Sequence, residues 1–384
     1  MIYFDNAATT YPKPNNVYKK LNEYKDYGFN AGRGSYSKAS DLSDLIEETR
    51  ELLKEVTGLK KDYKTIFTSS ATNAINIVLK GQDWKKGDIV YYSPFEHNAV
   101  LRSLYFLKKQ HEIILKEIPF DNKTLKLEVE NFKNEISKEV ERVKFICVTH
   151  LSNVLGIELP LKNIIDIKNE YNIQLLVDGA QAAGMIDLSN LDNIDYYIFA
   201  GHKTLYGPSG IGGFLLHNNA PTPKPLIHGG TGLKSELSTM PDKIPQKLEA
   251  GSSNALSIIG LKASLSWLND IGLSEIYDHH RNLTRDIRNI FKSFHDITVF
   301  PQKNVSDNQV GIVSVNFKNH PPTEISKILD ENFNIAVRGG LHCAPETHEF
   351  LNTSPQGLVR FSLGYFNSED ELTKLKEVLN TFCI

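Results

Sequence analysis

The chain has 384 residues, of which 40% are hydrophobic and 23% are charged, and its formal net charge is -3. This length predicts two or three domains, and the composition is that of a globular protein that buries a full core. The charge gives no electrostatic reason to expect a nucleic acid or an anionic membrane as partner. No apolar run approaches the roughly 20 residues of a membrane span, and the N-terminus lacks the features of a signal peptide. We therefore expect a cytoplasmic protein.

The cysteines and histidines argue against disulfides and metals. Cys147, Cys343 and Cys383 form an odd set without C-x-x-C spacing, so neither a disulfide framework nor a zinc ribbon is predicted. The 12 histidines include no H-E-x-x-H motif, and the pair His279–His280 is expected on the surface. No metal site is expected.

The first half of the chain alternates between helix patterns and short apolar runs. Residues 40–57 have helical spacing, with Ser40 as the expected N-cap and Gly58 as the stop. The apolar runs that follow are KTIFTSS, DIVYYS, EIILKEI, VKFICVTH, IQLLVDG, DYYIFAG and GIGGFLL. Most of them are linked by helical segments, which predicts a mostly parallel sheet with helices on both faces. The link between the last two runs is too short for a crossover helix, so we expect one antiparallel edge.

The second half reads as a smaller α/β layer. A Pro- and Gly-rich stretch after residue 217 is followed by a helical segment near 255–294 and by the short runs TVFP, GIVSVNF, IAVRGG and GLVRFSLG. We predict an N-terminal segment (1–15) that packs with the small domain, a large domain (16–255), and a small C-terminal domain (256–384) that carries the Cys343 loop.

Polar residues follow five strands of the predicted sheet. They are Ser69, Ser70 and Thr72; Glu96, His97 and Asn98; Thr149, His150 and Asn153; Asp178 and Gln181; and His202 and Lys203. Each group alone is explained as a helix cap or a turn. Together they lie where open parallel sheets bind ligands, and they supply hydroxyl, imidazole, amide, carboxylate and amine groups.

Lys203 is the least expected of these residues, because an ammonium at the end of a buried strand is costly unless it is paired or neutralised. A lysine in a partly desolvated site has a lowered pKa and forms a Schiff base with an aldehyde. Pyridoxal 5'-phosphate (PLP) needs such a lysine, an acidic partner for its ring nitrogen, and phosphate donors at a helix N-terminus. Asp178 and the region of Thr72 meet these needs, and His97 is placed to cover the ring. The loop GPSGIGG lacks the spacing of a dinucleotide-binding loop.

Cys343 is the candidate for a reactive thiol. It lies in the segment AVRGGLHCAPETHEF, in a glycine-rich loop near Arg338 and His342, which are surroundings that favour a thiolate. An unreactive loop cysteine stays open as the alternative. Cys147 is expected in the core, and Cys383 is expected to have no role.

These motifs resemble the class V aminotransferase family, and within it the cysteine desulfurases, over nearly the whole chain. The resemblance rests on YFDNAATTYPKP, EHNAVL, THLSNVLGIELP, VDGAQAAG, GHKTLYGPSGIG, LEAGSSN, VRGGLHCAP and VRFSLGYFN. It implies the fold-type I α/β architecture of PLP enzymes, working as a homodimer with sites near the subunit interface. The short loop around Cys343 is similar to that of group II desulfurases. Two departures are Ala200, where many relatives have a serine that contacts the phosphate, and Gly32, where some have a histidine.

The resemblance also implies a role for each matching residue. Lys203, Cys343 and His97 are the implied catalytic residues. The cofactor would be held by Ala71, Thr72, His97, Asn153, Asp178, Gln181, His202, Lys203 and, from the neighbouring subunit, Ser252. The substrate would be bound by Arg33, Asn153, Arg338 and Arg360.

The implied reaction converts L-cysteine to L-alanine, leaves a persulfide on Cys343, and supplies the sulfur to an acceptor such as an iron-sulfur scaffold or a sulfur-relay protein. The alternatives are a selenocysteine lyase acting on L-selenocysteine, another class V PLP-dependent lyase or transferase, and a binding protein without catalysis. The set Lys203, Asp178, Gln181 and Arg360 argues against the last of these.

Overall fold

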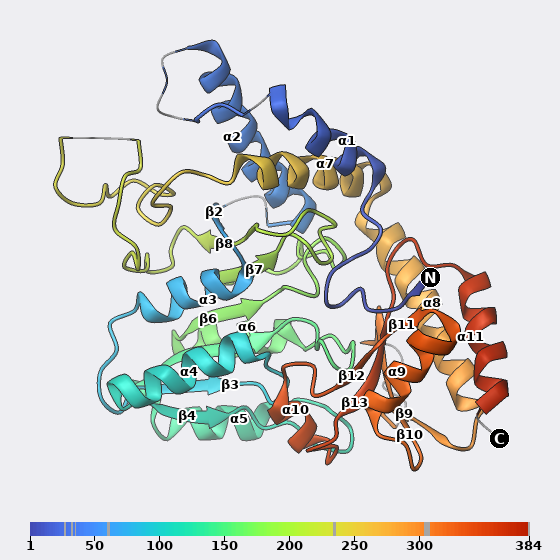
Figure 1. The fold of residues 1–384 in the computed structure, drawn as a ribbon. Helices are drawn as coiled ribbons and strands as arrows, with labels where there is room; N and C mark the ends of the chain where they lie inside the picture. The colour runs from blue at the N-terminus through green and yellow to red at the C-terminus, as the bar shows by residue number, and fades with distance from the viewer. Residues whose placement is uncertain are drawn as a thin grey trace.

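The computed structural model describes residues 1–26, 28–31, 34, 36–59, 62–232, 236–302 and 308–382. A seven-stranded sheet with helices on both faces forms the larger part, and a four-stranded sheet with its own helices lies beside it (Figure 1). Within the described residues, no helix is long and apolar enough to cross a membrane.

The seven apolar runs of the first half form the seven strands of the large sheet. These are β2 (Tyr63–Thr68), β3 (Ile89–Tyr92), β4 (Ile114–Glu117), β5 (Val143–Thr149), β6 (Gln174–Asp178), β7 (Tyr196–Ala200) and β8 (Gly212–His217). Their order is β2-β8-β7-β6-β5-β3-β4. Every residue of β3, β7 and β8 is buried, as in sheets that are covered on both faces.

The predicted antiparallel strand, β8, is present, but it is not at the edge of the sheet. The prediction of an antiparallel edge was therefore wrong. β8 runs antiparallel to both β7 and β2, and β2 forms the edge. The short link after β7 reverses the chain direction, as expected. β2 comes first in the sequence and pairs with the outer side of β8.

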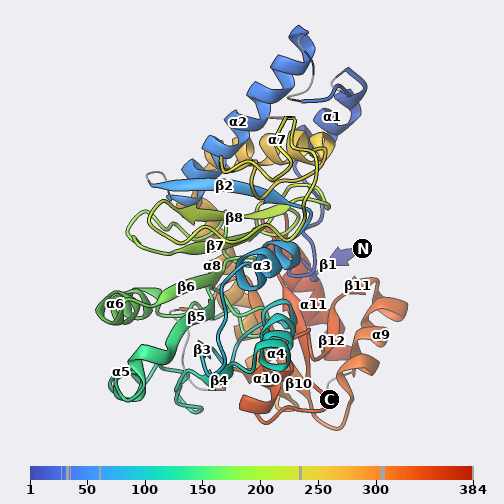
Figure 2. The same cartoon turned by 90° about the vertical axis from the view of Figure 1, so that its left-hand side faces the viewer.

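Helices cover the two faces of this sheet (Figure 2). α3 (Ala71–Lys80) and α4 (Asn98–His111) bury one apolar cluster, and α2 (Ser37–Thr57), α5 (Val129–Ser137), α6 (Leu161–Tyr171) and α7 (Ala255–Ile271) bury the other. The remaining helical elements of this part are α1 (Asn15–Asn22) and the short 3-10 turns Glu23–Asp26 and Val140–Arg142.

The predicted start of α2 was wrong and its predicted end is confirmed. The helix begins at Ser37 after Tyr36, so Ser40 lies inside the first turn rather than at the cap. It ends at Gly58, whose φ of +82° is readily adopted only by a residue without a Cβ.

The smaller sheet is antiparallel throughout, in the order β12-β13-β10-β9. Its strands are β9 (Ile297–Phe300), β10 (Ile312–Phe317), β12 (Arg338–Gly340) and β13 (Leu358–Ser362). The accompanying helices are α8 (Leu273–Lys292), α9 (Pro322–Phe333), α10 (Pro345–Phe350) and α11 (Glu369–Phe382). α8, α9 and α11 share a separate apolar cluster with this sheet, which confirms the predicted smaller α/β layer.

The N-terminal segment connects the two sheets. β1 (Ile2–Tyr3) pairs in parallel with β11 (Ile335–Ala336), so both chain ends lie on the side of the smaller sheet (Figure 1). The segment then crosses to the large sheet, where the backbone N–H of Thr10 donates to the carbonyl of His202 at 3.1 Å. The domain boundaries given above stay a prediction.

The expectation of a surface position was wrong for His280. This residue lies inside α8 and is buried, with its Nδ1 2.7 Å from the carbonyl oxygen of Ile276. It packs towards Tyr206, so its role is structural. In the part of the chain that is described, no group of three or more His, Cys, Asp or Glu side chains is placed to hold a metal ion.

Candidate active site

A cavity of about 260 Å³ opens at the carboxyl ends of the parallel strands. It gathers residues from five strand ends of the large sheet together with β12 and β13 of the smaller one. Its lining includes Ser70, Ala71, Thr72, His97, Thr149, Asn153, Asp178, Gln181, Ala200, His202, Lys203, Arg338, His342 and Arg360. Nearly all the residues singled out from the sequence therefore meet in one place.

Lys203 lies in the loop after β7, and its side chain lines the cavity. Among the described residues, its Nζ makes no hydrogen bond and no ion pair within 4.0 Å. Burial lowers its pKa, the carboxylate of Asp178 opposes that change, and the cationic Arg360 adds to it. An amine with a lowered pKa and no partner is available as a nucleophile and as a base.

Asp178 ends β6 and is only 5% exposed. One of its oxygens, Oδ1, accepts a hydrogen bond from the backbone N–H of Ala180 at 3.0 Å. Burial raises the pKa of this carboxyl, while the Ala180 N–H and the charge of Lys203 oppose the rise. A buried carboxyl of this kind is suited to pair with a cation in the cavity.

His97 is a neutral imidazole with a defined tautomer. It is the N-cap of α4, and its Nδ1 accepts a hydrogen bond from the backbone N–H of Ala99 at 3.0 Å, so the proton is on Nε2. Burial, followed by the nearby cations Lys203 and Arg338, lowers the pKa of His97 to about 3. The ring therefore stays uncharged at physiological pH.

The N-terminus of α3 forms the anion-binding part of the cavity. Ser70 caps this helix by accepting from the backbone N–H of Asn73 at 3.2 Å, and Ala71 and Thr72 form its first turn. The first N–H groups of a helix lack intrahelical partners and favour anions such as phosphate. His202 lines the same cavity, and its buried Nδ1 makes no hydrogen bond within the part of the chain that is described. Ala200 also lines the cavity, and its methyl side chain offers no hydroxyl at this position of the wall.

Arg360, on β13, is 1% exposed and brings a guanidinium into the cavity. Its Nη1 donates to the carbonyl of Asn153 at 3.0 Å, and its Nη2 donates to Oδ1 of Asp5 at 2.7 Å. Its Nε is buried and makes no hydrogen bond within the described residues. The Nδ2 of Asn153 in turn donates to the carbonyl of His342 at 2.7 Å.

Cys343 lies in the loop between β12 and α10, as predicted, and is partly buried. The Nη2 of Arg338 donates to its Sγ at 3.4 Å. His342 and Cys343 have φ values of +51° and +58°, a region that non-glycine residues seldom adopt. The backbone N–H of Asn98 donates to the carbonyl of Cys343 at 2.6 Å and so ties the loop to the start of α4. Hydrogen bonds thus hold the Cys343 loop against the residues of the cavity.

Some of the strand-end residues do not line the cavity but make buried hydrogen bonds between the strands that form it. Glu96 is fully buried, and its Oε1 accepts from the hydroxyl of Ser93 at 2.5 Å and from the backbone N–H of Thr149 at 2.6 Å. His150 is buried with its Nδ1 3.1 Å from the hydroxyl of Tyr197. These contacts join neighbouring strand ends.

Other sequence predictions fall elsewhere. Cys147 is buried in β5 and burial raises the pKa of its thiol, which confirms a core residue. Ser252 does not line the Lys203 cavity of its own chain but a second cavity, of about 270 Å³, with Leu226 and Ile227. Arg33, Gly32 and Cys383 lie outside the described residues.

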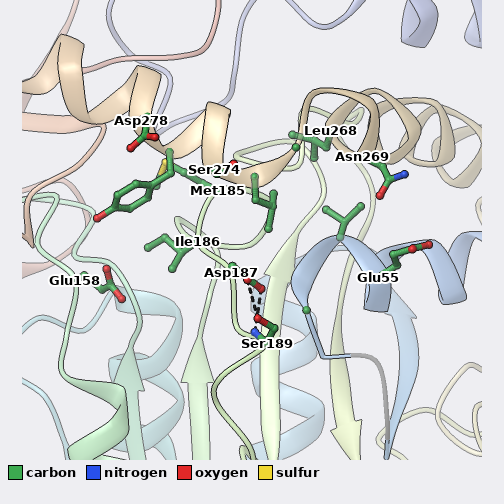
Figure 3. Close-up of a pocket in the computed structure, with 15 residues that line it drawn as sticks. Glu55, Glu158, Met185, Ile186, Asp187, Ser189, Leu268, Asn269, Ser274 and Asp278 are labelled. Carbon is green, nitrogen blue, oxygen red and sulfur yellow. Dashed lines mark hydrogen bonds between the residues drawn. The ribbon is translucent and has the colours of Figure 1, made fainter.

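The largest of these cavities, about 650 Å³, does not contain Lys203. Figure 3 shows it between α2, the loop after β6, and the junction of α7 and α8. Glu55, Glu158, Asp187 and Asp278 line it, and its described lining contains no lysine, histidine or cysteine. Volume alone therefore does not locate the chemistry.

The Lys203 cavity fits PLP. It combines an amine without a partner, the buried carboxyl of Asp178, and a helix N-terminus with unpaired N–H groups. The unpartnered Nδ1 of His202 and Nε of Arg360 are polar atoms that a ligand with phosphate and carboxylate groups would satisfy.

The sequence matches the family model described as aminotransferase class-V over residues 2–375. The chain belongs to the class V aminotransferase family. It is 33% identical to a probable cysteine desulfurase of Methanothermobacter thermautotrophicus, over 98% of this chain and 94% of the relative. It is 30% identical to a cysteine desulfurase of Escherichia coli, over 98% of this chain and 91% of the relative.

Solved structures agree with this family assignment. The apo structure of a cysteine desulfurase from Thermococcus onnurineus has a TM-score of 0.88 and 27% identity, and it covers 100% of this chain and 94% of the other. The S-sulfonic acid form of the cysteine desulfurase CsdA from Escherichia coli has a TM-score of 0.84 and 26% identity, covering 99% and 94%. The prediction of a class V enzyme with the PLP-dependent α/β fold, related to cysteine desulfurases, is confirmed.

The N-terminal side of this class V site is not predicted by local sequence patterns. Asp5 pairs with Arg360, the carbonyl of Ala7 accepts from Nε2 of Gln181 at 2.9 Å, and Nζ of Lys13 donates to the carbonyl of His202 at 2.7 Å. Burial lowers the pKa of Lys13 to about 7. No periodicity marks these residues, because long-range backbone contacts, the bridge of Asp5 to Ser362 and the bond from Thr10 to His202, hold this segment at the site.

Proposed function

We propose that the protein is a PLP-dependent cysteine desulfurase that converts L-cysteine to L-alanine and takes up the sulfur on Cys343. The observation that carries the proposal is a single cavity that combines the buried amine of Lys203 with the Nε of Arg360, which makes no hydrogen bond within the described residues. Cys343 is joined to that cavity through Arg338. The named relatives support the choice of L-cysteine as the substrate.

The cofactor would be held by residues of the cavity together with one residue of a second subunit. Lys203 would carry the covalent link, Asp178 would pair with the ring nitrogen, and Gln181 would bond the phenolic oxygen. The other residues of this set are His97 over the ring, Ala71, Thr72 and His202 at the phosphate, Asn153 at the edge of the site, and Ser252 from the neighbouring subunit of a homodimer. When bound, PLP supplies an electron sink for negative charge that develops at the substrate's Cα.

The substrate's carboxylate would bind Arg360. A guanidinium offers five N–H donors in a fixed fork, and one donor on Nη1 and one on Nη2 are already used, which leaves Nε and its neighbour for two carboxylate oxygens. Asn153 and Arg338 would complete this end of the site, and Arg33 would lie at the entrance.

Proton transfer and sulfur transfer would fall to two different residues. The amine of Lys203, whose pKa is lowered by burial, takes the proton from the substrate's Cα. The Cys343 thiolate then attacks the substrate's sulfur, so that a sulfur–sulfur bond forms and the bond between Cβ and sulfur breaks. The electron pair of that bond stays on the carbon side, which is later protonated to give alanine. The N–H of Arg338 that reaches Sγ is a donor suited to hold the negative charge on sulfur.

The persulfide would pass to an acceptor, such as an iron-sulfur scaffold or a sulfur-relay protein, in the cytoplasm. The direct bonds that hold the Cys343 loop support a group II enzyme, in which the loop is short and fixed. The domain boundaries 1–15, 16–255 and 256–384 belong to the same proposal.

The direct test offers L-cysteine and L-selenocysteine to the purified, PLP-loaded protein and measures alanine, sulfide and selenide. A desulfurase releases one alanine per sulfur from L-cysteine. Turnover of L-selenocysteine alone would instead favour a selenocysteine lyase. Turnover of neither substrate would point to another class V lyase or transferase.

A further inference from the structure

Asp5 is the only counter-ion that the described structure gives to the Arg360 guanidinium. The Nη2–Oδ1 distance is 2.7 Å, and the two side chains are 1% and 22% exposed. Asp5 and the carbonyl of Asn153 each accept one N–H group at the end of the fork, while Nε donates to no acceptor among the described residues. The contacts thus fix the direction of the fork and leave its Nε side unused.

The position of Asp5 is set by the backbone rather than by its own side chain. Asp5 forms a parallel bridge with Ser362, two residues beyond Arg360 on β13. The backbone N–H of Ser362 donates to the carbonyl of Phe4 at 2.7 Å, and that of Asn6 donates to the carbonyl of Ser362 at 3.3 Å. The carboxylate is therefore presented from a hydrogen-bonded strand, which is a more rigid support than a loose loop end.

We propose that Asp5 is a positioning residue for carboxylate recognition: it holds Nη2 of Arg360 so that the Nε side of the guanidinium faces the cavity and receives the carboxylate of the amino-acid substrate. This inference rests on the proposed function, because it takes Arg360 as the group that binds the substrate's carboxylate.

Two physical effects of Asp5 act in opposite directions. Its negative charge repels a second carboxylate on the same guanidinium, which weakens binding. Its hydrogen bond holds the fork in one orientation, so that the ligand does not have to order it. Without Asp5, the guanidinium would keep only the hydrogen bond to the carbonyl of Asn153 and would be free to turn about it. The proposal requires the orienting effect to exceed the repulsion, so the sign of the change in affinity decides between them.

The test compares two ligands of the PLP-loaded protein that differ only in the carboxylate, L-alanine and ethylamine. Their dissociation constants are measured from the change in cofactor absorbance, without turnover. The variants are Asp5→Ala, which removes the acceptor, and Asp5→Asn, which keeps an oxygen acceptor for Nη2 without the charge. Asp296→Asn is the matched control, because it removes a surface carboxylate that lies 3.8 Å from Lys318, outside the cavity.

Asp5→Ala should raise the dissociation constant of L-alanine by about tenfold, the loss expected for one misdirected charge-assisted hydrogen bond. In Asp5→Ala, the dissociation constant of ethylamine should change by less than about twofold. Asp296→Asn should change the dissociation constant of neither ligand. Asp5→Asn should raise the L-alanine value by about threefold and leave ethylamine unchanged, which keeps the test valid if Asp5→Ala does not fold. In an Arg360→Lys background, Asp5→Ala should raise the dissociation constant of L-alanine by less than about twofold more, because the two residues act through one contact.

Three results would overturn the inference. Equal weakening of L-alanine and ethylamine would mean a general structural role for Asp5. Unchanged L-alanine binding would mean no role, and tighter binding would mean that Asp5 only competes with the ligand. Failure of the proposed function is separate and is seen in the wild-type protein: L-alanine binding without release of sulfur from L-cysteine would refute the desulfurase while leaving this test intact.

Discussion

Replacing Arg360 with lysine should weaken substrate binding without unfolding the protein. Lysine keeps a positive charge opposite Asp5 but lacks the planar fork that binds a carboxylate with two parallel N–H groups. The loss of one charge-assisted hydrogen bond is worth roughly 1.5–3 kcal/mol. Since about 1.4 kcal/mol is a factor of ten, the KM for L-cysteine should rise about 10- to 150-fold.

Stability should change less in Arg360→Lys than in Arg360→Ala. The alanine variant leaves Asp5 and the carbonyl of Asn153 without their partner, and removing one member of a buried pair costs roughly 3–5 kcal/mol. The assay is steady-state kinetics together with urea unfolding. Arg288→Lys is the matched control, because Arg288 is another buried arginine, bonded to the carbonyls of Phe300 and Pro301, and its replacement should lower stability but leave KM unchanged. A KM within twofold of wild type in Arg360→Lys would refute carboxylate binding by Arg360.

Three further predictions follow from the same site. Lys203→Ala should fold normally yet lose the borohydride-reducible covalent link to PLP, measured by the mass of the reduced protein; a link that persists would place it on another lysine. Mixed dimers of Lys203→Ala and Ser252→Ala subunits should regain one site of normal PLP affinity, because that site takes Lys203 from one subunit and Ser252 from the other; no recovery would mean that Ser252 does not act across the interface. Burial lowers the pKa of Lys13 from 10.5 to about 7, so the folded state binds fewer protons than the unfolded state between these values. The unfolding free energy of wild type, relative to that of Lys13→Met, should therefore rise from pH 7 to pH 9. Parallel profiles of unfolding free energy against pH for the two proteins would contradict this.

Local sequence patterns predicted most of the fold and the large-sheet side of the site. The seven strands of the large sheet follow from short apolar runs, and the polar residues after them meet at one edge because parallel strands share a direction. Lys203 was recognisable because an amine at the end of a buried strand needs a chemical reason.

Features that depend on long-range pairing could not be predicted in the same way. Asp5 and Arg360 are 355 residues apart along the chain, and the bridge of Asp5 to Ser362 on β13 brings them together. The length of a link predicts that β8 reverses direction, but not that β2 adds outside it.

The error at His280 was avoidable. Ile276, His280, Leu283 and Ile287 are spaced along one face of α8, and all four are buried. That spacing is present in the sequence and places His280 on the apolar face of the helix. The N-cap error at Ser40 is of a different kind, because Tyr36 precedes the helix without a capping bond from its side chain.

The most direct measurement of the central claim is peptide mass analysis after brief exposure of the PLP-loaded protein to L-cysteine without a reductant. The account predicts one extra sulfur on the Cys343 peptide, and none in Cys343→Ala, which should still change the cofactor spectrum on addition of L-cysteine but release little alanine. Cys147 is buried in β5 and should stay unmodified. Extra sulfur on Cys147 or Cys383 instead, or full L-cysteine turnover in Cys343→Ala, would contradict the claim that Cys343 receives the sulfur.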